Sequence, residues 1–262
     1  MKAIILAAGR GHRFGGMTDE IPKCMLNFVS KSILCHQIDT FLNAGVTDIA
    51  IVKGYLPDKI LSAARRSYIN TAYADTNMLY SLFCAKQELT ENVIISYADI
   101  IYENALLCKL LGTTTADIAV VVDTNWKEYY QQRYGDPFRE AESLVLSSDH
   151  TILEIGRSKP REEDIQGQYI GLIRLNSSGC KFFKDTYAEL VRTCTPEWKF
   201  RGRSLKDAYM TDFLQILINK GITITAIPVS NGWLEFDSVS DYDLAIRWYE
   251  TGVLSRFYRD PV

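Results

Sequence analysis

The sequence predicts an α/β protein with a mostly parallel mixed sheet flanked by helices. The main observation is an alternation of short apolar runs with helical patterns, which begins at residue 2 and continues past the midpoint of the chain. The second is composition, because 262 residues with 47% hydrophobic and 23% charged side chains are enough for a conventional core. We expect one domain over residues 1–262 with a lid-like insertion at 126–168.

The elements follow in order from these patterns. Apolar runs predict strands at 2–6, 48–52, 93–97, 118–122, 169–174 and 223–228. Helices are expected at 33–44, 57–66, 79–89, 104–111, 177–193 and 207–220, with a last helix from Ser240. In the first helix Leu34, Ile38 and Phe41 share one face, and Gly45 follows where a left-handed cap is favoured. Within 126–168 the pattern becomes aromatic and charged, with short strands at 144–146 and 152–155.

Several classes of protein are disfavoured by the same sequence. The longest apolar runs are strand-sized, so we expect no membrane span and no signal sequence, and a cytoplasmic protein. The six cysteines form no CxxC pair, which predicts reduced thiols and neither a zinc site nor a disulfide framework. A net charge of −3 argues against nucleic acid as a partner. Oligomeric state stays open, a homodimer included.

A turn of small residues comes directly after the first strand. It runs Leu6-Ala7-Ala8-Gly9-Arg10-Gly11-His12-Arg13, and its backbone amides are suited to phosphate oxygens. A Rossmann fingerprint would need a third glycine at Phe14, and a Walker loop would need Gly-Lys-Ser/Thr, so neither fits. Arg13 offers a planar fork and Lys23, fixed by Pro22, a compact charge. These two cations are predicted to clamp a triphosphate.

The turn and the following Pro22-Lys23 resemble the LAAGxGxR...PK signature of the sugar-phosphate and phosphocholine nucleotidyltransferase superfamily. Further blocks at 73–81, 97–99, 168–172 and 233–237 are similar to its phosphocholine and phosphonate cytidylyltransferase branch, so the resemblance covers nearly the whole chain. It implies a Rossmann-like fold and transfer of CMP from CTP to a small phosphorylated or phosphonate acceptor, such as a phosphocholine-like, phosphonate or phosphoryl-amide compound, with release of pyrophosphate. The implied catalytic residues are Arg13 and Lys23. The implied nucleotide-binding residues are Leu6, Ala8, Gly9, Gly11, Asn77, Ser81 and Ala98.

Two carboxylates are candidates for a metal site. Asp99 follows the strand at 93–97, at the sheet edge where open α/β proteins bind ligands, and Asp237 follows the apolar run at 233–236. Carboxylates at one edge can hold Mg²⁺ while phosphate oxygens complete its octahedron. In the resembling family the residues aligned with Asp99 and Asp237 hold the catalytic metal. Glu235 and Asp241 remain competitors for the second position.

The expected chemistry requires position and charge more than a base. An acceptor phosphate or phosphonate oxygen attacks the α-phosphorus in line, and pyrophosphate leaves on the opposite side. Because that oxygen is already anionic near neutral pH, no general base is needed. His12 is accordingly interpreted as a loop side chain.

Recognition of the base and of the acceptor is less sharply defined. Asn77 is the first candidate for the base, although it suits a helix N-cap equally well. Aromatic residues of the insertion could surround a quaternary ammonium or simply pack, and its arginines could hold an anionic acceptor or lie in solvent. The predicted acceptor-binding residues are Trp126, Tyr129, Arg133, Tyr169, Trp233 and Glu235.

Two other functions compete with cytidylyl transfer. One keeps the fold but makes the chain a hexose-1-phosphate nucleotidyltransferase that uses UTP or dTTP. The other is a nucleotide-binding regulatory homologue without turnover, which the presence of all four charged candidates disfavours. A glycosyltransferase is weaker still, because the only Asp-x-Asp triplet, at 241–243, falls on the expected last helix.

Overall fold

The computed structural model of the chain describes residues 1–260. Its central sheet has seven strands in the order β12-β8-β11-β6-β1-β4-β5. Neighbouring strands are parallel except at β11, which is antiparallel to both β6 and β8. The strands are β1 (Lys2–Ala7), β4 (Asp48–Lys53), β5 (Arg66–Ile69), β6 (Val93–Tyr97), β8 (Ile118–Asp123), β11 (Gln168–Leu175) and β12 (Thr225–Val229). The predicted mostly parallel mixed sheet is confirmed.

Helices cover both faces of this sheet. Alternate residues of β1 enter two different cores: Ala3, Ile5 and Ala7 face one, while Ile4 and Leu6 face the other. The first core also contains buried residues of α1 (Ile33–Asn43), α3 (Asn104–Gly112), α4 (Trp126–Tyr134) and α7 (Val239–Thr251). The second contains those of α2 (Met78–Cys84), α5 (Ser177–Thr193) and α6 (Met210–Asn219). The result is a three-layer, Rossmann-like arrangement.

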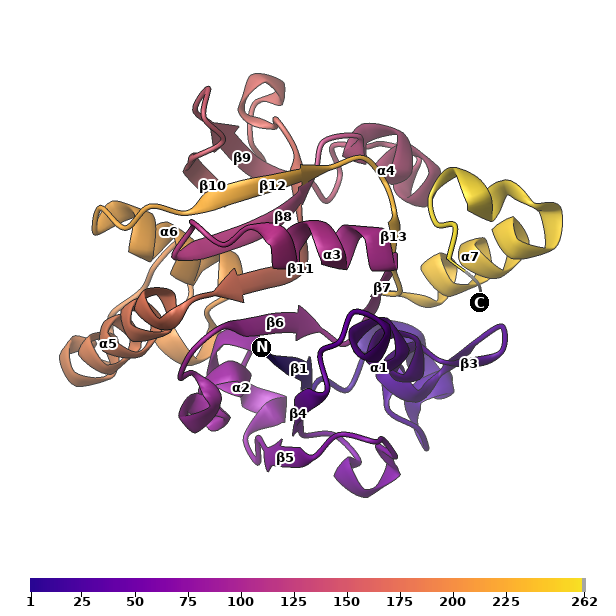
Figure 1. Cartoon of the computed structure of the whole chain (residues 1–262), viewed down its shortest axis with the longest axis horizontal. Coiled ribbons are helices and arrows are strands. Elements are labelled where there is room, and N and C mark those ends of the chain that lie inside the picture. The colour runs from indigo at the N-terminus through magenta and orange to yellow at the C-terminus, as the bar shows by residue number, and fades with distance from the viewer. Residues whose placement is uncertain (261–262) are drawn as a thin grey trace.

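Three short ladders stand apart from the sheet. They pair β7 (Ile100–Tyr102) with β13 (Trp233–Glu235), β9 (Glu142–Leu146) with β10 (Ile152–Ser158), and β2 (Asn27–Phe28) with β3 (Lys31–Ser32). In Figure 1, β6 points toward the side where β7, β13 and α7 lie, whereas β11 points away from it. The carboxyl ends of the parallel strands therefore meet the β7–β13 ladder, as expected for a ligand site.

One predicted helix is wrong. The segment 57–66 contains a single 3-10 turn (Pro57–Lys59), and the chain then adds β5 as an edge strand beside β4. Leu61 is largely exposed, so the segment has no apolar stripe to hold a helix against the sheet. The helix expected at 79–89 is also shorter, because α2 ends at Cys84 and a 3-10 turn covers Lys86–Glu88.

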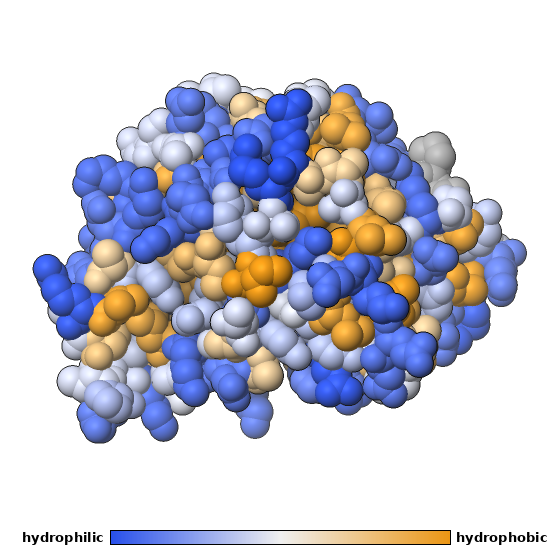
Figure 2. All heavy atoms as spheres, turned by 90° about the horizontal axis from the view of Figure 1, so that it is seen from below, coloured by the Kyte–Doolittle hydropathy of each residue, from blue (hydrophilic) through white to orange (hydrophobic). Residues whose placement is uncertain are grey.

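The segment 126–168 lies between β8 and β11 and begins with α4, followed by the β9–β10 hairpin. The two short strands expected there are confirmed, while its movement as a lid stays a prediction. Within residues 1–260 no helix has both the length and the apolarity needed to cross a membrane. On the face seen from below, hydrophobic residues form separate groups among hydrophilic ones (Figure 2).

Candidate active site

The glycine-rich turn after β1 brings the chain close to Lys23. Gly11 has φ +75°, a conformation that L side chains rarely adopt, and a Cβ placed there would lie 3.0 Å from the Lys23 Cβ. Glycine at this position therefore allows both the turn and the approach of the lysine. A small hollow beside it is lined by Leu6, Ala7, Gly9, Gly11, Lys23, Cys24, Met78, Ala98 and Asp99. The predicted phosphate loop and both Lys23 and Asp99 thus share one cavity wall.

Four charged side chains predicted from separate parts of the sequence meet at this edge. The Lys23 Nζ lies 2.6 Å from an Asp99 carboxylate oxygen and 3.5 Å from Asp237. One Arg13 guanidinium nitrogen lies 2.6 Å from the other Asp237 oxygen. Burial alone would lower the pKa of Lys23, but the nearby Asp99 and Asp237 carboxylates raise it above its ordinary value. The lysine is therefore a permanent cation between two carboxylates.

The main chain fixes the separation of the two carboxylates. Asp99 immediately precedes β7 and Asp237 follows β13, and the Phe236 amide donates to the Asp99 carbonyl at 2.8 Å. Asp241 is used differently from the proposed ligands. It forms a capping box with Ser238 at the start of α7, and its carboxylate accepts from the Asp237 amide at 3.2 Å. Asp241, one of the two alternatives for the second metal ligand, thus holds the segment that carries Asp237.

The donor set fits a divalent cation that also binds phosphate. Asp99 Oδ1 is buried and accepts no hydrogen bond from any described residue, so one carboxylate oxygen is left for a ligand. Over residues 1–260 no three His, Cys, Asp or Glu side chains converge as a protein-only metal site. Magnesium commonly uses one or two carboxylates together with substrate phosphates, so the Asp99–Asp237 pair satisfies its preference.

A larger cavity of about 280 Å³ extends from the charged cluster toward β9, β11 and α6. Its charged lining is five carboxylates and one arginine, namely Asp99, Glu140, Glu142, Glu235, Asp237 and Arg13. Tyr97, Tyr130, Tyr169 and Tyr209 add phenol rings, and Asn77, Gln168 and Thr211 add neutral polar groups. The Tyr169 hydroxyl is buried with no hydrogen-bond partner among the described residues. The cavity is therefore strongly acidic away from Arg13.

The predicted nucleotide-binding residues divide into two groups. Asn77 lines the large cavity and is also the N-cap of α2, where its Oδ1 accepts from the Met78 amide at 2.8 Å. Both roles left open for this residue are compatible with that position. Ser81 is buried and accepts from Asn70 Nδ2 at 3.0 Å, and the Ala8 carbonyl accepts from the Tyr55 amide. Neither Ser81 nor Ala8 faces the two cavities, so we interpret them as supports of the loop.

The predicted aromatic acceptor residues pack in the core. Trp126, Tyr129 and Trp233 are each at most 5% exposed and do not line the cavity. Trp233 donates its indole N–H to Asp123 at 2.9 Å, and the Tyr129 hydroxyl accepts from the Glu235 amide. Burial of large rings with their polar atoms satisfied is the ordinary structural use of such residues. These three side chains, predicted to contact the acceptor, are therefore core residues outside the cavity lining.

Arg133 occupies the cation position among the α4 tyrosines. Its guanidinium carbon lies 5.2 Å, 5.7 Å and 4.7 Å from the ring centres of Tyr129, Tyr130 and Tyr134. The side chain is 1% exposed and forms ion pairs with Glu235 at 2.5 Å and Asp241 at 2.9 Å. Arg133, which was predicted to bind the acceptor, therefore does not line the cavity. It holds the two acidic residues that flank Asp237.

Glu235 connects this buried cluster to the cavity. Burial raises its pKa even though Arg133 is its direct partner. Burial would also raise the pKa of Asp241, but hydrogen bonds from Arg133 and Ser238 lower it below its ordinary value. Of the predicted acceptor residues, Tyr169 and Glu235 line the cavity, whereas Arg133 acts one layer behind it.

The sequence prediction missed Glu140, Glu142, Tyr209 and Thr211, which line the far wall of the cavity. Glu142 begins β9, and Tyr209 caps α6 in a capping box with Asp212. Burial raises the pKa of Glu142. The run Tyr209-Met-Thr-Asp begins a helix, but nothing local indicates that it faces a cavity whose other lining residues come from distant parts of the chain.

Comparison with known proteins identifies a family and relatives of this chain. A family described as "MobA-like NTP transferase domain" matches residues 3–153. A CTP:phosphoglutamine cytidylyltransferase of Campylobacter jejuni is 34% identical over 257 residues, covering 94% of this chain and 99% of the relative. A choline-phosphate cytidylyltransferase of Streptococcus pneumoniae is 32% identical over 157 residues, covering 58% of this chain and 67% of the relative.

A solved structure supports the fold. The CTP:phosphocholine cytidylyltransferase of Streptococcus pneumoniae superposes with a TM-score of 0.68 at 22% identity, covering 95% of this chain and 98% of that one. Its likeness extends over the whole three-layer arrangement. The chain belongs to the MobA-like NTP transferase domain family and is related to nucleotidyltransferases, among them CTP-dependent cytidylyltransferases.

Proposed function

We propose that the chain transfers CMP from CTP to a small phosphorylated or phosphonate acceptor and releases pyrophosphate. The observation that carries this proposal is the convergence of Arg13 and Lys23 with Asp99 and Asp237 beside the glycine-rich turn. Cations that bind phosphates and carboxylates that bind a metal are the groups that phosphoryl and nucleotidyl transfer require. The preference for CTP is supported by the names of the two relatives.

Mg²⁺ is the proposed cofactor, held by Asp99 and Asp237. When bound, it would neutralise phosphate charge and orient the triphosphate. Lys23 lies between both carboxylates and beside Gly11, so its ammonium group is within the same hollow as the phosphate-binding amides. Arg13 reaches the cavity from the other side and binds a phosphate oxygen through its planar fork.

The protein's part in the reaction is to position charge. Gly9 and Gly11 allow close approach of the triphosphate, and Lys23 and Arg13 stabilise the charge that develops on the departing pyrophosphate. The acceptor oxygen attacks the α-phosphorus from the large cavity, opposite the leaving group. An anionic oxygen needs no proton acceptor, so the raised pKa of Glu235 is not required for the step.

The cavity lining supports an acceptor with a cationic nitrogen. If Asp99 and Asp237 serve the metal and Glu235 is paired with Arg133, Glu140 and Glu142 remain as carboxylates on the acceptor side, where Glu140 has only an exposed contact with Arg139 at 4.0 Å. An ammonium group placed among carboxylates and tyrosines gains both ion pairs and cation–π contacts. Phosphocholine and phosphorylated amino compounds have this chemistry, and hexose 1-phosphates do not.

A pyrophosphate-release panel tests the proposal. Each of CTP, UTP, dTTP and GTP is combined with phosphocholine, phosphoethanolamine and glucose 1-phosphate in the presence of Mg²⁺. We expect turnover with CTP and an amine-bearing acceptor. Activity only with UTP or dTTP and glucose 1-phosphate would favour the hexose-1-phosphate alternative. Absence of activity with CTP and every acceptor would refute cytidylyl transfer.

A further inference from the structure

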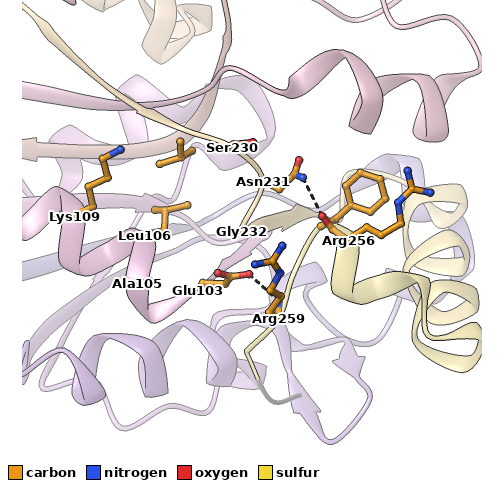
Figure 3. A pocket seen from close by; sticks show the side chains of 11 residues that line it. Glu103, Ala105, Leu106, Lys109, Ser230, Asn231, Gly232, Arg256 and Arg259 are labelled. Atoms are coloured by element: carbon orange, nitrogen blue, oxygen red, sulfur yellow. Dashed lines mark hydrogen bonds between the residues drawn. The ribbon is translucent and has the colours of Figure 1, made fainter.

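A second cavity lies at one end of the β7–β13 ladder, and the charged cluster lies at the other end. It has a volume of about 250 Å³ and is formed by the start of α3, the loop between β12 and β13, and the C-terminal segment (Figure 3). The residues that line it include Glu103, Lys109, Ser230, Asn231, Arg256 and Arg259. None of them belongs to the proposed catalytic site.

Hydrogen bonds between main-chain groups join the three walls of this cavity. The Glu103 amide donates to the Gly232 carbonyl at 2.8 Å, and the Gly232 amide donates to the Phe257 carbonyl at 2.8 Å. Asn231 and Gly232 both have positive φ, which turns the loop sharply into the start of β13. The Asn231 side chain also donates to the Arg256 carbonyl at 2.9 Å. The cavity is therefore built by fixed backbone and not by chance contacts of side chains.

The charge inside the cavity is positive. Its lining includes three exposed cations, Lys109, Arg256 and Arg259, and one carboxylate, Glu103, which accepts from the Arg259 main-chain amide at 2.8 Å. Arg256 pairs with Glu128, but within residues 1–260 neither Lys109 nor Arg259 has an acidic side chain in ion-pair range. Lys109 donates to the Pro228 carbonyl, and Arg259 Nε donates to the Ser255 carbonyl at 3.2 Å. Two cationic heads held by carbonyl groups beside a cavity attract an anion.

The size of the cavity limits that anion. Pockets for drug-sized ligands are usually about 300–1,000 Å³, so about 250 Å³ fits a smaller molecule. Arginine and lysine together suit phosphate oxygens, and the hydroxyl of Ser230 can add a hydrogen bond. We propose that this cavity binds a small phosphate-bearing anion and that its occupancy changes the affinity of the active site for nucleotide.

The ladder between the two sites gives the physical connection. Tyr102 pairs with Trp233 at the end next to the second cavity, and Ile100 pairs with Glu235 at the other end. Asp99 and Asp237, the proposed metal ligands, lie just beyond that other end, about 10 Å along the strands. An anion that moves Lys109 and Arg259 acts on the hydrogen bond between Glu103 and Gly232. Through the ladder it then changes the positions of the two proposed metal ligands. This coupling rests on the proposed nucleotide site, whereas binding of the anion does not.

Binding of inorganic phosphate to the full chain tests the site. Calorimetry is done on the Lys23→Ala variant, which weakens phosphate binding at the active site, and on the same variant with Lys109→Gln and Arg259→Gln added. We expect the second protein to bind phosphate at least about tenfold more weakly, because two charge-assisted contacts are lost. Arg192→Gln, a matched change at an exposed arginine on α5, should leave binding unaltered. The proposed site is refuted if Lys23→Ala does not bind phosphate. It is also refuted if Lys23→Ala, its Lys109→Gln/Arg259→Gln derivative and the Arg192→Gln control all bind phosphate equally.

The chemical class of the anion and the coupling between the second cavity and the nucleotide site need separate measurements. Glycerol 3-phosphate and pyrophosphate, titrated in the same way, distinguish a phosphate monoester from a free inorganic anion. The affinity for CTP with Mg²⁺ is then measured without acceptor, with and without phosphate. We expect a change of about threefold or more in a protein with the native cavity and none after Lys109→Gln/Arg259→Gln. If phosphate leaves the affinity for CTP unchanged in both the native-cavity protein and the variant, the coupling is refuted. Lack of turnover in the pyrophosphate-release panel would contradict only the proposed function.

Discussion

The buried arginine of α4 gives the sharpest prediction. In Arg133→Met the aliphatic length is roughly kept, but Glu235 and Asp241 lose the cation that lies within 2.9 Å of both. Removing one partner of a buried ion pair costs about 3–5 kcal/mol, because a charge is left without compensation. The Arg133 side chain is only 1% exposed, so water cannot replace it. We expect the free energy of unfolding to fall by that amount.

Urea denaturation and thermal unfolding measure the effect. At about 2–4 °C per kcal/mol for a chain of this size, the expected fall in Tm is about 6–20 °C. Arg161→Met is the matched control, because Arg161 also pairs with two acidic residues but is 72% exposed. That change should have little effect on stability, because solvent screens exposed ion pairs. Adding Glu235→Gln to Arg133→Met should restore part of the loss, since it removes one uncompensated charge. Equal losses for the two arginine variants would refute the reasoning.

Four further predictions follow from the site and the core. Lys23→Ala and Asp99→Asn should each lower kcat for pyrophosphate release by about 10²-fold or more; undiminished rates would contradict the site. Glu142→Gln should raise KM for phosphocholine about tenfold and leave KM for CTP unchanged. Trp126→Ala should cost about 3–5 kcal/mol in urea denaturation with little change in KM for the acceptor, which a contacting residue would alter. Burial lowers the pKa of His36 in the folded chain, so the unfolded chain takes up the proton first as pH falls. Stability should therefore decline below about pH 6.5, and His36→Gln should reduce that decline between about pH 7.5 and pH 5.5.

Parts of the site that depend on local sequence could be predicted. Gly11 is needed for a left-handed turn, and glycines directly after a strand, followed by Arg13 and Lys23, are suited to a phosphate loop. Asp99 follows a buried strand, which places it at the carboxyl edge of a parallel sheet. The last helix, expected from Ser240, begins at Val239 with a capping box of Ser238 and Asp241. Each of these features is determined by a few neighbouring residues, so it can be predicted without knowing the tertiary structure.

Features decided by tertiary contacts could not be predicted in this way. The local pattern at 57–66 predicted a helix, but the chain forms a single 3-10 turn there and then adds β5 at the edge beside β4. The wall formed by Glu142 and Thr211 joins residues nearly 70 positions apart, through β9 and the start of α6. No spacing rule connects such positions, because their proximity depends on how the hairpin packs against the helix.

The tyrosines of α4 show why an aromatic cluster alone is weak support for a cation-binding site. The rings do surround a cation, but it is Arg133 of the same helix, fixed by Glu235 and Asp241. A second cation in that space would face the guanidinium group at short range and gain nothing from rings already occupied. The nitrogen of an acceptor must therefore lie further along the cavity. The carboxylates of Glu140 and Glu142 there make charge, and not an aromatic cage, the main determinant of which acceptor binds.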